Sequence, residues 1–241
     1  MTTEVAPGVH RLGNAVVNFY LVEDGDGLTL VDAGIPRMQR NAEAALAARG
    51  RTLADLDAIV LTHAHPDHTG FAEAARRAGV AVWVHELDAE LARTSRGQKR
   101  EAKFLPYLRH RATWKVIGTF AAGGLPRRIR EVRTYADGAT DLPAGLRPIH
   151  TPGHSHGHCA LHLPERGALL TGDALCGWNP LTGRQGAQIM PSAFNTSTQT
   201  AMRSLDRLEG LDASTVLFGH GEPWTDGIAS AVARARAAGP S

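Results

Sequence analysis

Residues 62–70 carry four metal-binding side chains in one short segment, which is the strongest constraint that this sequence places on its fold. An apolar run at 58–61 precedes the segment and predicts a short buried strand. An alanine- and arginine-rich run at 70–78 follows it and predicts a helix. The four side chains should therefore lie in the loop where a strand ends and a helix begins, and they are His63, His65, Asp67 and His68.

The spacing of these four residues provides two binding faces. His63 and His65 are separated by one residue, so in extended backbone their side chains point the same way and can hold one ion. Asp67 and His68 follow Pro66, where the chain turns, and they point elsewhere. Neutral imidazoles and a carboxylate suit zinc, and iron or manganese less exclusively. The alternative is a polar surface loop, in which Asp67 would only cap the following helix.

Composition sets broad limits on the class of protein. The chain has 241 residues, which suits one large α/β domain over 1–241, and 43% of them are hydrophobic. The formal net charge of +2 indicates no particular partner. Cys159 and Cys176 are the only cysteines, so no disulfide framework is predicted, although a single bridge between them stays open.

Residues 1–7 have neither the basic region nor the apolar region of a signal peptide. No apolar run is long enough to span a membrane. Both features favour a cytoplasmic protein without a membrane partner.

Strands and helices are expected to alternate along the chain. Residues 9–34 predict a β-meander, with strands at 9–12, 16–22 and 28–31. Beyond 58–61, further strands are expected at 80–84, 146–150, 159–163, 168–171 and 215–218. Besides 70–78, helices are expected at 37–49, 86–93, 196–209 and 226–238. Residues 174–194 are expected to form a long loop.

The segment at about 95–135 differs in composition from its surroundings. From Arg93 to Arg133 the chain has twelve basic residues and two acidic ones, interleaved with aromatic side chains. A helical insert that packs on the domain explains this pattern, and so does a cap over the site that contacts substrate. The aromatic surface could also mediate a homodimer. Nucleic-acid binding is less favoured, because no recognised motif accompanies the charge.

Three later segments repeat the arrangement of the first, in which a strand ends and a metal-binding residue follows next to glycine. Those residues are His154, Asp173 and His220. Functional residues of layered α/β folds gather on loops at strand ends, so all seven side chains could converge. They would serve two four- or five-coordinate ions and leave an open position. Asp32, also at a strand end, could shape a turn or orient a ligand histidine, whereas His85 is predicted to be structural.

The sequence resembles the metallo-β-lactamase superfamily of hydrolases. The segment His63-Ala64-His65-Pro66-Asp67-His68 is similar to the His-x-His-x-Asp-His motif of that family. Its later motifs match, in order, Thr151-Pro152-Gly153-His154, Gly172-Asp173 and Gly219-His220-Gly221. The resemblance covers about residues 9–222. It implies an α/β fold, namely a four-layer αββα sandwich with the metals at one edge.

The resemblance also implies a ligand set and a chemistry. It gives one metal site as His63, His65 and His154, the other as Asp67, His68 and His220, and Asp173 as the bridge between them. Two ions, Zn²⁺ first with iron or manganese as options, would share a water and turn it into a bridging hydroxide nucleophile. Asp67 would be the catalytic residue that orients this water and handles its proton. His158 would support the ligands, and His156 matches no role in the family.

Departures from the known branches narrow the activity that the resemblance implies. β-Lactamases are usually exported and typically lack the bridging aspartate. Glyoxalase II-like thioesterases normally carry a C-terminal helical domain, and here about twenty residues follow His220. Homoserine-lactone lactonases commonly place a tyrosine soon after the aspartate, where this chain has Ala174-Leu175-Cys176-Gly177-Trp178.

The resemblance therefore implies a dinuclear metal-dependent hydrolase of a small-molecule ester, thioester or lactone. One alternative is an iron-dependent persulfide dioxygenase or a flavodiiron-like redox protein, which would use similar ligands. Another is an RNA or phosphodiester hydrolase that uses the basic insert.

Overall fold

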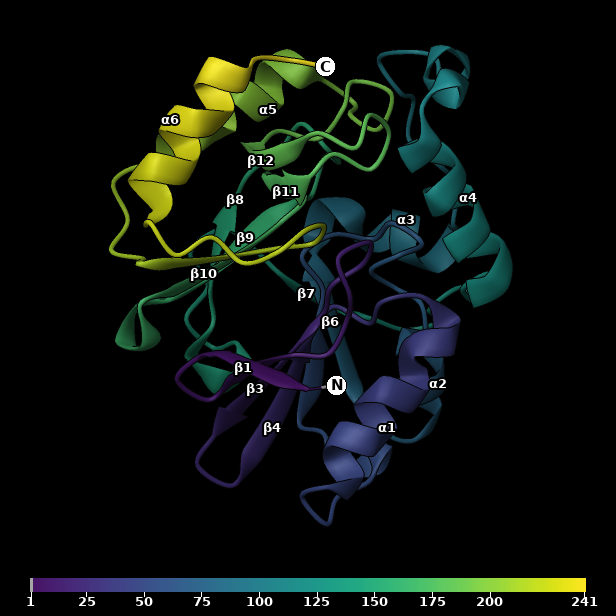
Figure 1. The fold of residues 1–241 in the computed structure, drawn as a ribbon. Coiled ribbons are helices and arrows are strands. Elements are labelled where there is room, and N and C mark those ends of the chain that lie inside the picture. The colour runs from purple at the N-terminus through teal and green to yellow at the C-terminus, as the bar shows by residue number, and fades with distance from the viewer. Residues whose placement is uncertain (1) are drawn as a thin grey trace.

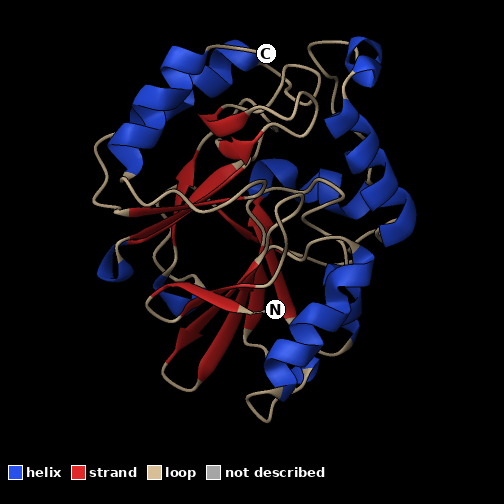
Figure 2. Ribbon diagram, in the orientation of Figure 1, coloured by secondary structure: helices blue, strands red, loops and turns tan. Residues whose placement is uncertain are grey.

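Two β-sheets lie face to face at the centre of the computed structural model, which describes residues 2–241 (Figure 1). Helices cover the outer side of each sheet, as the colouring in Figure 2 shows. The layers therefore run helix, sheet, sheet, helix. The predicted four-layer αββα sandwich is confirmed.

The first sheet has seven strands, whose order in space is their order in the chain. They are β1 (Thr3–Ala6), β2 (Val9–Arg11), β3 (Tyr20–Asp24), β4 (Gly27–Val31), β5 (Ala58–Val60), β6 (Ala81–His85) and β7 (Arg133–Tyr135). Strands β1 to β4 pair antiparallel, and β4 to β7 pair parallel. The carboxyl ends of β4, β5 and β6 therefore meet at one edge.

The second sheet has the strand order β13-β10-β9-β8. Its strands are β8 (Arg147–His150), β9 (Cys159–Leu163), β10 (Ala168–Gly172) and β13 (Thr215–Phe218). Strand β9 is antiparallel to β8 and to β10, and β13 is parallel to β10. Strands β8, β10 and β13 therefore end at the same edge. A small separate hairpin consists of β11 (Cys176–Trp178) and β12 (Gln185–Gln188).

Three apolar cores fill the spaces between the four layers, and the two-residue period of the strands produces them. In β3, Leu21 packs toward the helices of its own sheet, whereas Tyr20 and Val22 pack toward the other sheet. In β10, Leu169 and Leu170 face opposite sides in the same way. Both faces of these strands are buried, so the two sheets are fixed against each other and their edges form a rigid frame.

The helices divide between the two outer layers (Figure 1). Those on the first sheet are α1 (Gln39–Ala47), α2 (Ala72–Arg77), α3 (Ala89–Thr94) and α4 (Arg111–Gly123), and those on the second are α5 (Thr198–Ser204) and α6 (Ile228–Ala238). Short 3-10 helices span Pro36–Met38, Leu53–Asp55, Glu86–Asp88, Leu105–Arg109, Pro143–Gly145, Pro164–Arg166 and Leu205–Arg207. Within residues 2–241, the structure contains no helix with the length and apolar character needed to cross a membrane.

Some predicted elements are wrong in extent. The strand expected at 16–22 begins only at Tyr20, because Asn14 Oδ1 accepts the N–H groups of Val16 and Val17, and Asn18 N–H bonds to Gly219. These backbone groups are used in a loop and cannot join the ladder. The segment 174–194 was expected to be one long loop, but it contains β11 and β12. Strands β1 and β7 were not predicted, and their short polar sequences carry no alternation.

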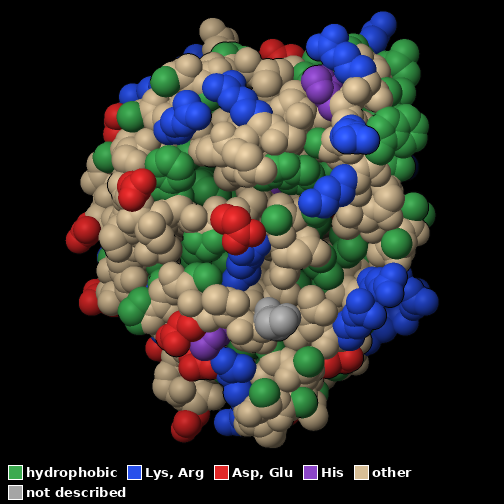
Figure 3. Space-filling model, viewed as in Figure 1, with side chains coloured by type: hydrophobic (Ala, Val, Ile, Leu, Met, Phe, Trp, Pro, Cys, Tyr) green, Lys and Arg blue, Asp and Glu red, His purple; other side chains and the backbone are tan. Residues whose placement is uncertain are grey.

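The basic segment at about 95–135 contains one 3-10 helix, α4 and the start of β7. Helix α4 packs Val116 against the core of the first sheet and leaves Trp114 58% exposed. Figure 3 shows hydrophobic and basic side chains together along the edge of the molecule where Figure 1 places α4. The segment therefore both packs on the domain and borders the site, because α4 lines the pocket described below.

Glu73 anchors α2, the helix that follows the segment with four metal-binding residues. Its carboxylate is buried and accepts hydrogen bonds from Arg76, Arg77 and the backbone N–H of Arg130. The hydrogen bond from Arg76 contributes most to lowering the pKa of Glu73, from 4.5 to about 2, although burial opposes it. The free energy that the carboxylate contributes to folding is complete above pH 4.5 and is lost as pH falls toward about 2.

We expect Glu73→Gln to lower the free energy of unfolding by about 2 kcal/mol at neutral pH, because the charge-assisted hydrogen bonds are lost. The difference from the wild type should narrow at about pH 3.5, where the wild-type advantage is itself reduced. Urea unfolding of the metal-free proteins at both pH values measures this. A difference that does not change with pH would contradict the assigned ionic role.

Candidate metal centre

The seven predicted residues all follow the carboxyl ends of strands, and the sandwich brings those ends together. His63 to His68 come after β5, His154 follows β8, Asp173 follows β10, and His220 follows β13. Because these strands end at facing edges of the two sheets, residues as far apart as 63 and 220 become neighbours. Three overlapping groups result, namely His63, His65 and His154; His63, His68 and Asp173; and Asp67, His68 and His220.

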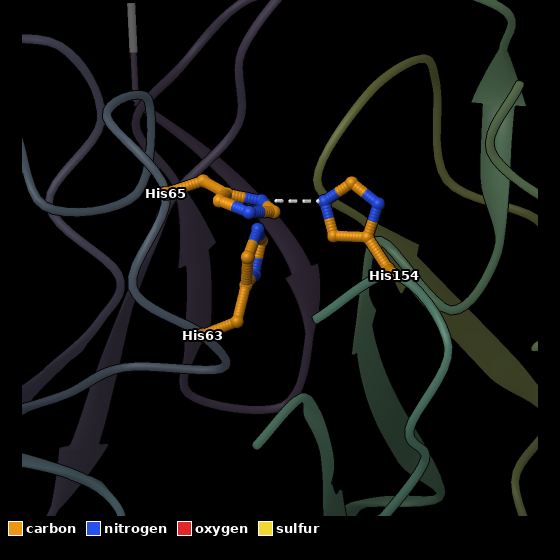
Figure 4. A group of neighbouring side chains, drawn as sticks. All are labelled: His63, His65 and His154. Atoms are coloured by element: carbon orange, nitrogen blue, oxygen red, sulfur yellow. Dashed lines mark hydrogen bonds between the residues drawn. The ribbon is translucent and has the colours of Figure 1, made fainter. Parts of the chain in front are cut away.

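The first group joins the two sheets. Figure 4 shows His63 and His65 on one loop and His154 on the opposite one, with ring nitrogens directed at a common point. His65 Nδ1 lies 2.7 Å from His154 Nε2. All three side chains are buried. Their separation and direction match the expectation that His63 and His65 point the same way.

The group of Asp67, His68 and His220 lies beside the first group, and Asp173 contacts both. His220 Nε2 lies 3.4 Å from Asp67 Oδ2 and 3.4 Å from Asp173 Oδ2. Asp173 Oδ2 is also 3.1 Å from His154 Nε2, a member of the first group. Its other oxygen, Oδ1, lies 3.5 Å from His68 Nε2. The carboxylate of Asp173 therefore stands between the two groups, where a bridging ligand would be.

The outward ring nitrogen of several histidines is held by the surrounding protein, which fixes the ring orientation. His68 Nδ1 is 2.8 Å from Asp32 Oδ2, and that carboxylate also accepts from Thr62 N. His220 Nδ1 bonds to the carbonyl of Val16. These contacts leave the opposite Nε2 atoms to face the centre. Of the two roles left open for Asp32, orienting a ligand histidine is the one that its contacts support.

Three buried polar atoms at the centre have no hydrogen-bond partner among residues 2–241: His63 Nε2, His68 Nε2 and Asp173 Oδ1. Buried polar atoms are normally paired, so these point to a ligand that the protein chain does not supply. Imidazole nitrogens and a carboxylate are a suitable donor set for zinc or iron. A Cβ added at Gly219 would lie only 2.3 Å from Asp173 Oδ1, so glycine is required there. The residues present fit a pair of bound metal ions.

Electrostatics in the cluster follow burial and neighbouring charge. Burial and the neighbouring histidines hold the pKa of His63 well below its usual value, and His65 behaves likewise. Burial alone would also lower the pKa of His68, but Asp32, Asp173 and Asp67 outweigh it and raise that pKa. Against the cost of burial, the nearby histidines lower the pKa of Asp173. His63 and His65 are therefore neutral and Asp173 is ionised, as metal binding requires, whereas the raised pKa values of His68 and His220 favour a proton that a bound ion would displace.

Other residues singled out in the sequence lie around the centre. His158 Nε2 accepts the backbone N–H of Asp173 at 2.9 Å, which agrees with a supporting position. His85 stacks on His150 with ring centroids 4.5 Å apart and belongs to none of the three groups. His156 is exposed. Cys159 and Cys176 are buried and unbridged, so the disulfide left open does not form.

Sequence reasoning missed Asp88, which connects the two loops that carry metal-binding residues. Its buried carboxylate accepts from Ala64 N on one loop and from Ser155 Oγ and Gly157 N on the other. Asp88 follows β6 as the other residues follow their strands, and that position was the available indication. Asn195 was also missed; its Oδ1 lies 3.3 Å from His154 Nδ1.

A pocket of about 140 Å³ opens onto the centre, and five of the seven residues line it, namely His65, Asp67, His154, Asp173 and His220. Arg100 is the remaining charged residue of the lining, and the other walls are apolar, formed by Pro66, Val116, Phe120, Pro180, Met190 and Phe194. A larger hollow of about 400 Å³ lies elsewhere, against Arg147 and Arg166, and none of the seven residues lines it. The smaller pocket is therefore the one in which a substrate can reach the metal-binding residues.

Comparison with models of known protein families shows to which family the chain belongs. The model of the metallo-β-lactamase superfamily matches residues 12–220, which is most of the chain. The chain belongs to the metallo-β-lactamase superfamily. This membership confirms the family, the fold and the general class of metal-dependent hydrolase that the sequence predicted.

Individual members of the metallo-β-lactamase superfamily are similar over nearly the whole chain. Two are from Bacillus subtilis (strain 168). The probable metallo-hydrolase YqjP is 32% identical over 93% of this chain and 74% of its own length, and the probable metallo-hydrolase YflN is 26% identical over 92% and 87%. The crystal structure of TTHA1623 in a di-iron-bound form is 29% identical, with a TM-score of 0.63 over 91% of this chain and 95% of that chain.

Proposed function

We propose that this protein uses two bound metal ions to hydrolyse a small ester, thioester or lactone. Zinc is the metal that we propose before iron or manganese. The observation that carries the proposal is the pocket of about 140 Å³ whose lining joins five metal-binding side chains to apolar walls. Ligand pockets of small molecules commonly span about 300–1,000 Å³, so this smaller one suits a compact substrate. For that reason we propose a small-molecule substrate over RNA.

Seven side chains would hold the ions: His63, His65 and His154 at one position, Asp67, His68 and His220 at the other, and Asp173 between them. When bound, two such ions lower the pKa of water toward neutrality and polarise the carbonyl of a substrate. The apolar walls exclude bulk water, which strengthens every electrostatic interaction in the pocket. Holding, orienting and shielding the reacting groups are the tasks of the chain itself.

Besides binding metal, Asp67 is proposed to orient the attacking water and to accept its proton. Its side chain is 13% exposed and lines the pocket, whereas that of Asp173 is 2% exposed. Asp67 is therefore the more accessible of the two carboxylates to a water in the pocket. General-base catalysis of this kind contributes about 100- to 10,000-fold to a rate.

We expect Asp67→Asn to lower kcat by at least about 100-fold, because the amide keeps the shape of the side chain but cannot take the proton. Metal content, measured on the same preparation, separates this effect from loss of an ion. A variant that retains two metals per chain and its full kcat would rule out the proton-transfer role.

The substrate bond can be tested with a panel of lactones, thioesters, phosphodiesters and a β-lactam on protein of known metal content. Turnover of esters, thioesters or lactones that disappears with a chelator and returns with metal is the expected result. Preferred cleavage of the phosphodiester or the β-lactam would overturn the proposed bond.

A redox function is the second candidate, because a relative of 29% identity is known in a di-iron-bound form. Protein purified without added zinc distinguishes the two. Stoichiometric iron with oxygen consumption would favour the redox candidate, and activity restored by zinc alone would favour hydrolysis.

A further inference from the structure

Arg100 is a cation in the substrate pocket that forms no ion pair with any residue of the described chain, 2–241. It lies in the segment between α3 and α4, and its guanidinium contacts His65 of the metal-binding group. Nη2 lies 3.1 Å from His65 Nε2, and Nη1 donates to the carbonyl of Phe194. A half-buried guanidinium without a carboxylate partner is costly to retain unless it has a ligand.

The contact with His65 is not a hydrogen bond when His65 binds a cation through Nδ1. His65 Nδ1 faces His154 Nε2 at 2.7 Å, so Nδ1 is the nitrogen directed into the metal-binding group. A neutral imidazole that binds a cation through Nδ1 carries its proton on Nε2. Both Nε2 and the guanidinium nitrogen are then donors, and no hydrogen bond can join them. Arg100 then still donates a hydrogen bond to the carbonyl of Phe194, but its other N–H groups need a new acceptor.

We propose that Arg100 determines substrate specificity by binding a carboxylate of the substrate, a few bonds from the bond that is cleaved. The inference rests on the proposed function and specifies its substrate class. Arg100 Nη2 lies 3.1 Å beyond Nε2 of the His65 ring whose Nδ1 faces His154, so an anion bound to the guanidinium lies near the metal-binding group. The planar fork of arginine matches a carboxylate with two parallel hydrogen bonds.

The donors of the pocket favour a carboxylate over a phosphate. Arg100 is the one lysine or arginine in the lining, so an anion held away from the metal-binding residues meets a single guanidinium. The planar guanidinium pairs with the two oxygens of a carboxylate and leaves the third oxygen of a phosphate monoester without a charged partner. Opposite the polar side, Val116, Phe120 and Met190 offer an apolar wall for the rest of the acyl group. The substrate class is therefore a compact anionic ester or thioester with a short apolar chain.

Kinetics with two matched esters test the specificity. The para-nitrophenyl half-ester of glutarate carries the carboxylate, and the same ester of glutaramic acid replaces it with a neutral amide. We expect Arg100→Gln to lower kcat/KM for the anionic ester by about 10- to 100-fold, mainly through KM, and to change the neutral ester by no more than about twofold. Arg100→Lys should recover part of the loss, because it restores the charge without the fork.

The control is Arg96→Gln, which removes the same charge from the same segment but from an exposed side chain outside the pocket. It should leave the ratio of the two kcat/KM values unchanged. If Arg96→Gln lowered that ratio as much as Arg100→Gln, a general effect of charge would replace the proposed contact. Equal effects of Arg100→Gln on both esters would also overturn the proposal.

Calorimetry on metal-loaded protein gives a readout that does not depend on turnover. Pentanoate should bind about 10- to 100-fold more weakly to Arg100→Gln than to the wild type, and pentanamide should bind both equally weakly. If neither ester is hydrolysed but pentanoate binding depends on Arg100, the hydrolase proposal fails and the carboxylate site stands. If both esters are hydrolysed, and Arg100→Gln changes neither the ratio of their kcat/KM values nor pentanoate binding, the carboxylate site is wrong and the hydrolase proposal stands. Inorganic phosphate binding more tightly than pentanoate through Arg100 would overturn the choice of carboxylate.

Discussion

Asp173→Ala is expected to abolish metal binding at both positions and to lower kcat/KM by at least about 1,000-fold. The carboxylate lies within 3.5 Å of His154, His68 and His220, so its removal takes a ligand from both groups at once. Metal analysis after gel filtration and the rate on an ester substrate measure the two losses together.

Two variants keep this prediction specific. Asp173→Asn preserves the size of the side chain, so a loss of metal in that variant cannot result from a cavity. His156→Ala removes an exposed imidazole that lies two residues beyond His154 and is absent from the metal-binding groups. It should retain both ions and its activity. An Asp173→Ala protein with two ions and full activity would show that Asp173 is no bridge.

Asp88→Ala should lower the free energy of unfolding by about 3–5 kcal/mol and weaken metal binding by about 10- to 100-fold. The carboxylate is fully buried and accepts from Ala64 N at 3.2 Å, Ser155 Oγ at 2.6 Å and Gly157 N at 2.8 Å. Without it, these donors are unpaired and the loops that carry His63, His65 and His154 lose their connection.

Urea unfolding and competition with a chromophoric chelator measure the stability and the metal affinity of Asp88→Ala separately. Asp57→Ala is the matched control, because Asp57 also accepts a backbone N–H, from Leu28, but lies outside the metal-binding groups. It should alter metal affinity little. If Asp88→Ala were destabilised yet bound metal as tightly as the wild type, Asp88 would contribute to folding alone.

Most of the fold could be predicted from local sequence. The strand at 215–218 has the predicted bounds, and those at 159–163 and 168–172 differ by at most one residue. Their apolar runs are buried on both faces, so hydrophobicity identifies them. Prediction was wrong where a side chain captured the backbone, as Asn14 does before β3, or where a short polar segment pairs only because a neighbour offers its edge, as at β7.

The chain sequence by itself determined which side chains can bind metal and that each follows a strand. Residue type and position relative to an apolar run are local properties, so the sequence alone is enough to single out His63, Asp173 and His220. Their convergence on one centre depended on β8, β10 and β13 running in the same direction within their sheet and on the packing of that sheet against the first.

Tertiary structure alone decided which other residues join the centre. Asp88 contacts a loop that lies 67 residues further along the chain, and Arg100 reaches a histidine 35 residues before it. Asp88 follows a strand, as Glu86 also does, and Arg100 lies among several basic residues, so local sequence does not single out either of them. Their roles arise because chain closure brings distant loops within hydrogen-bond distance, and a local pattern does not contain that information.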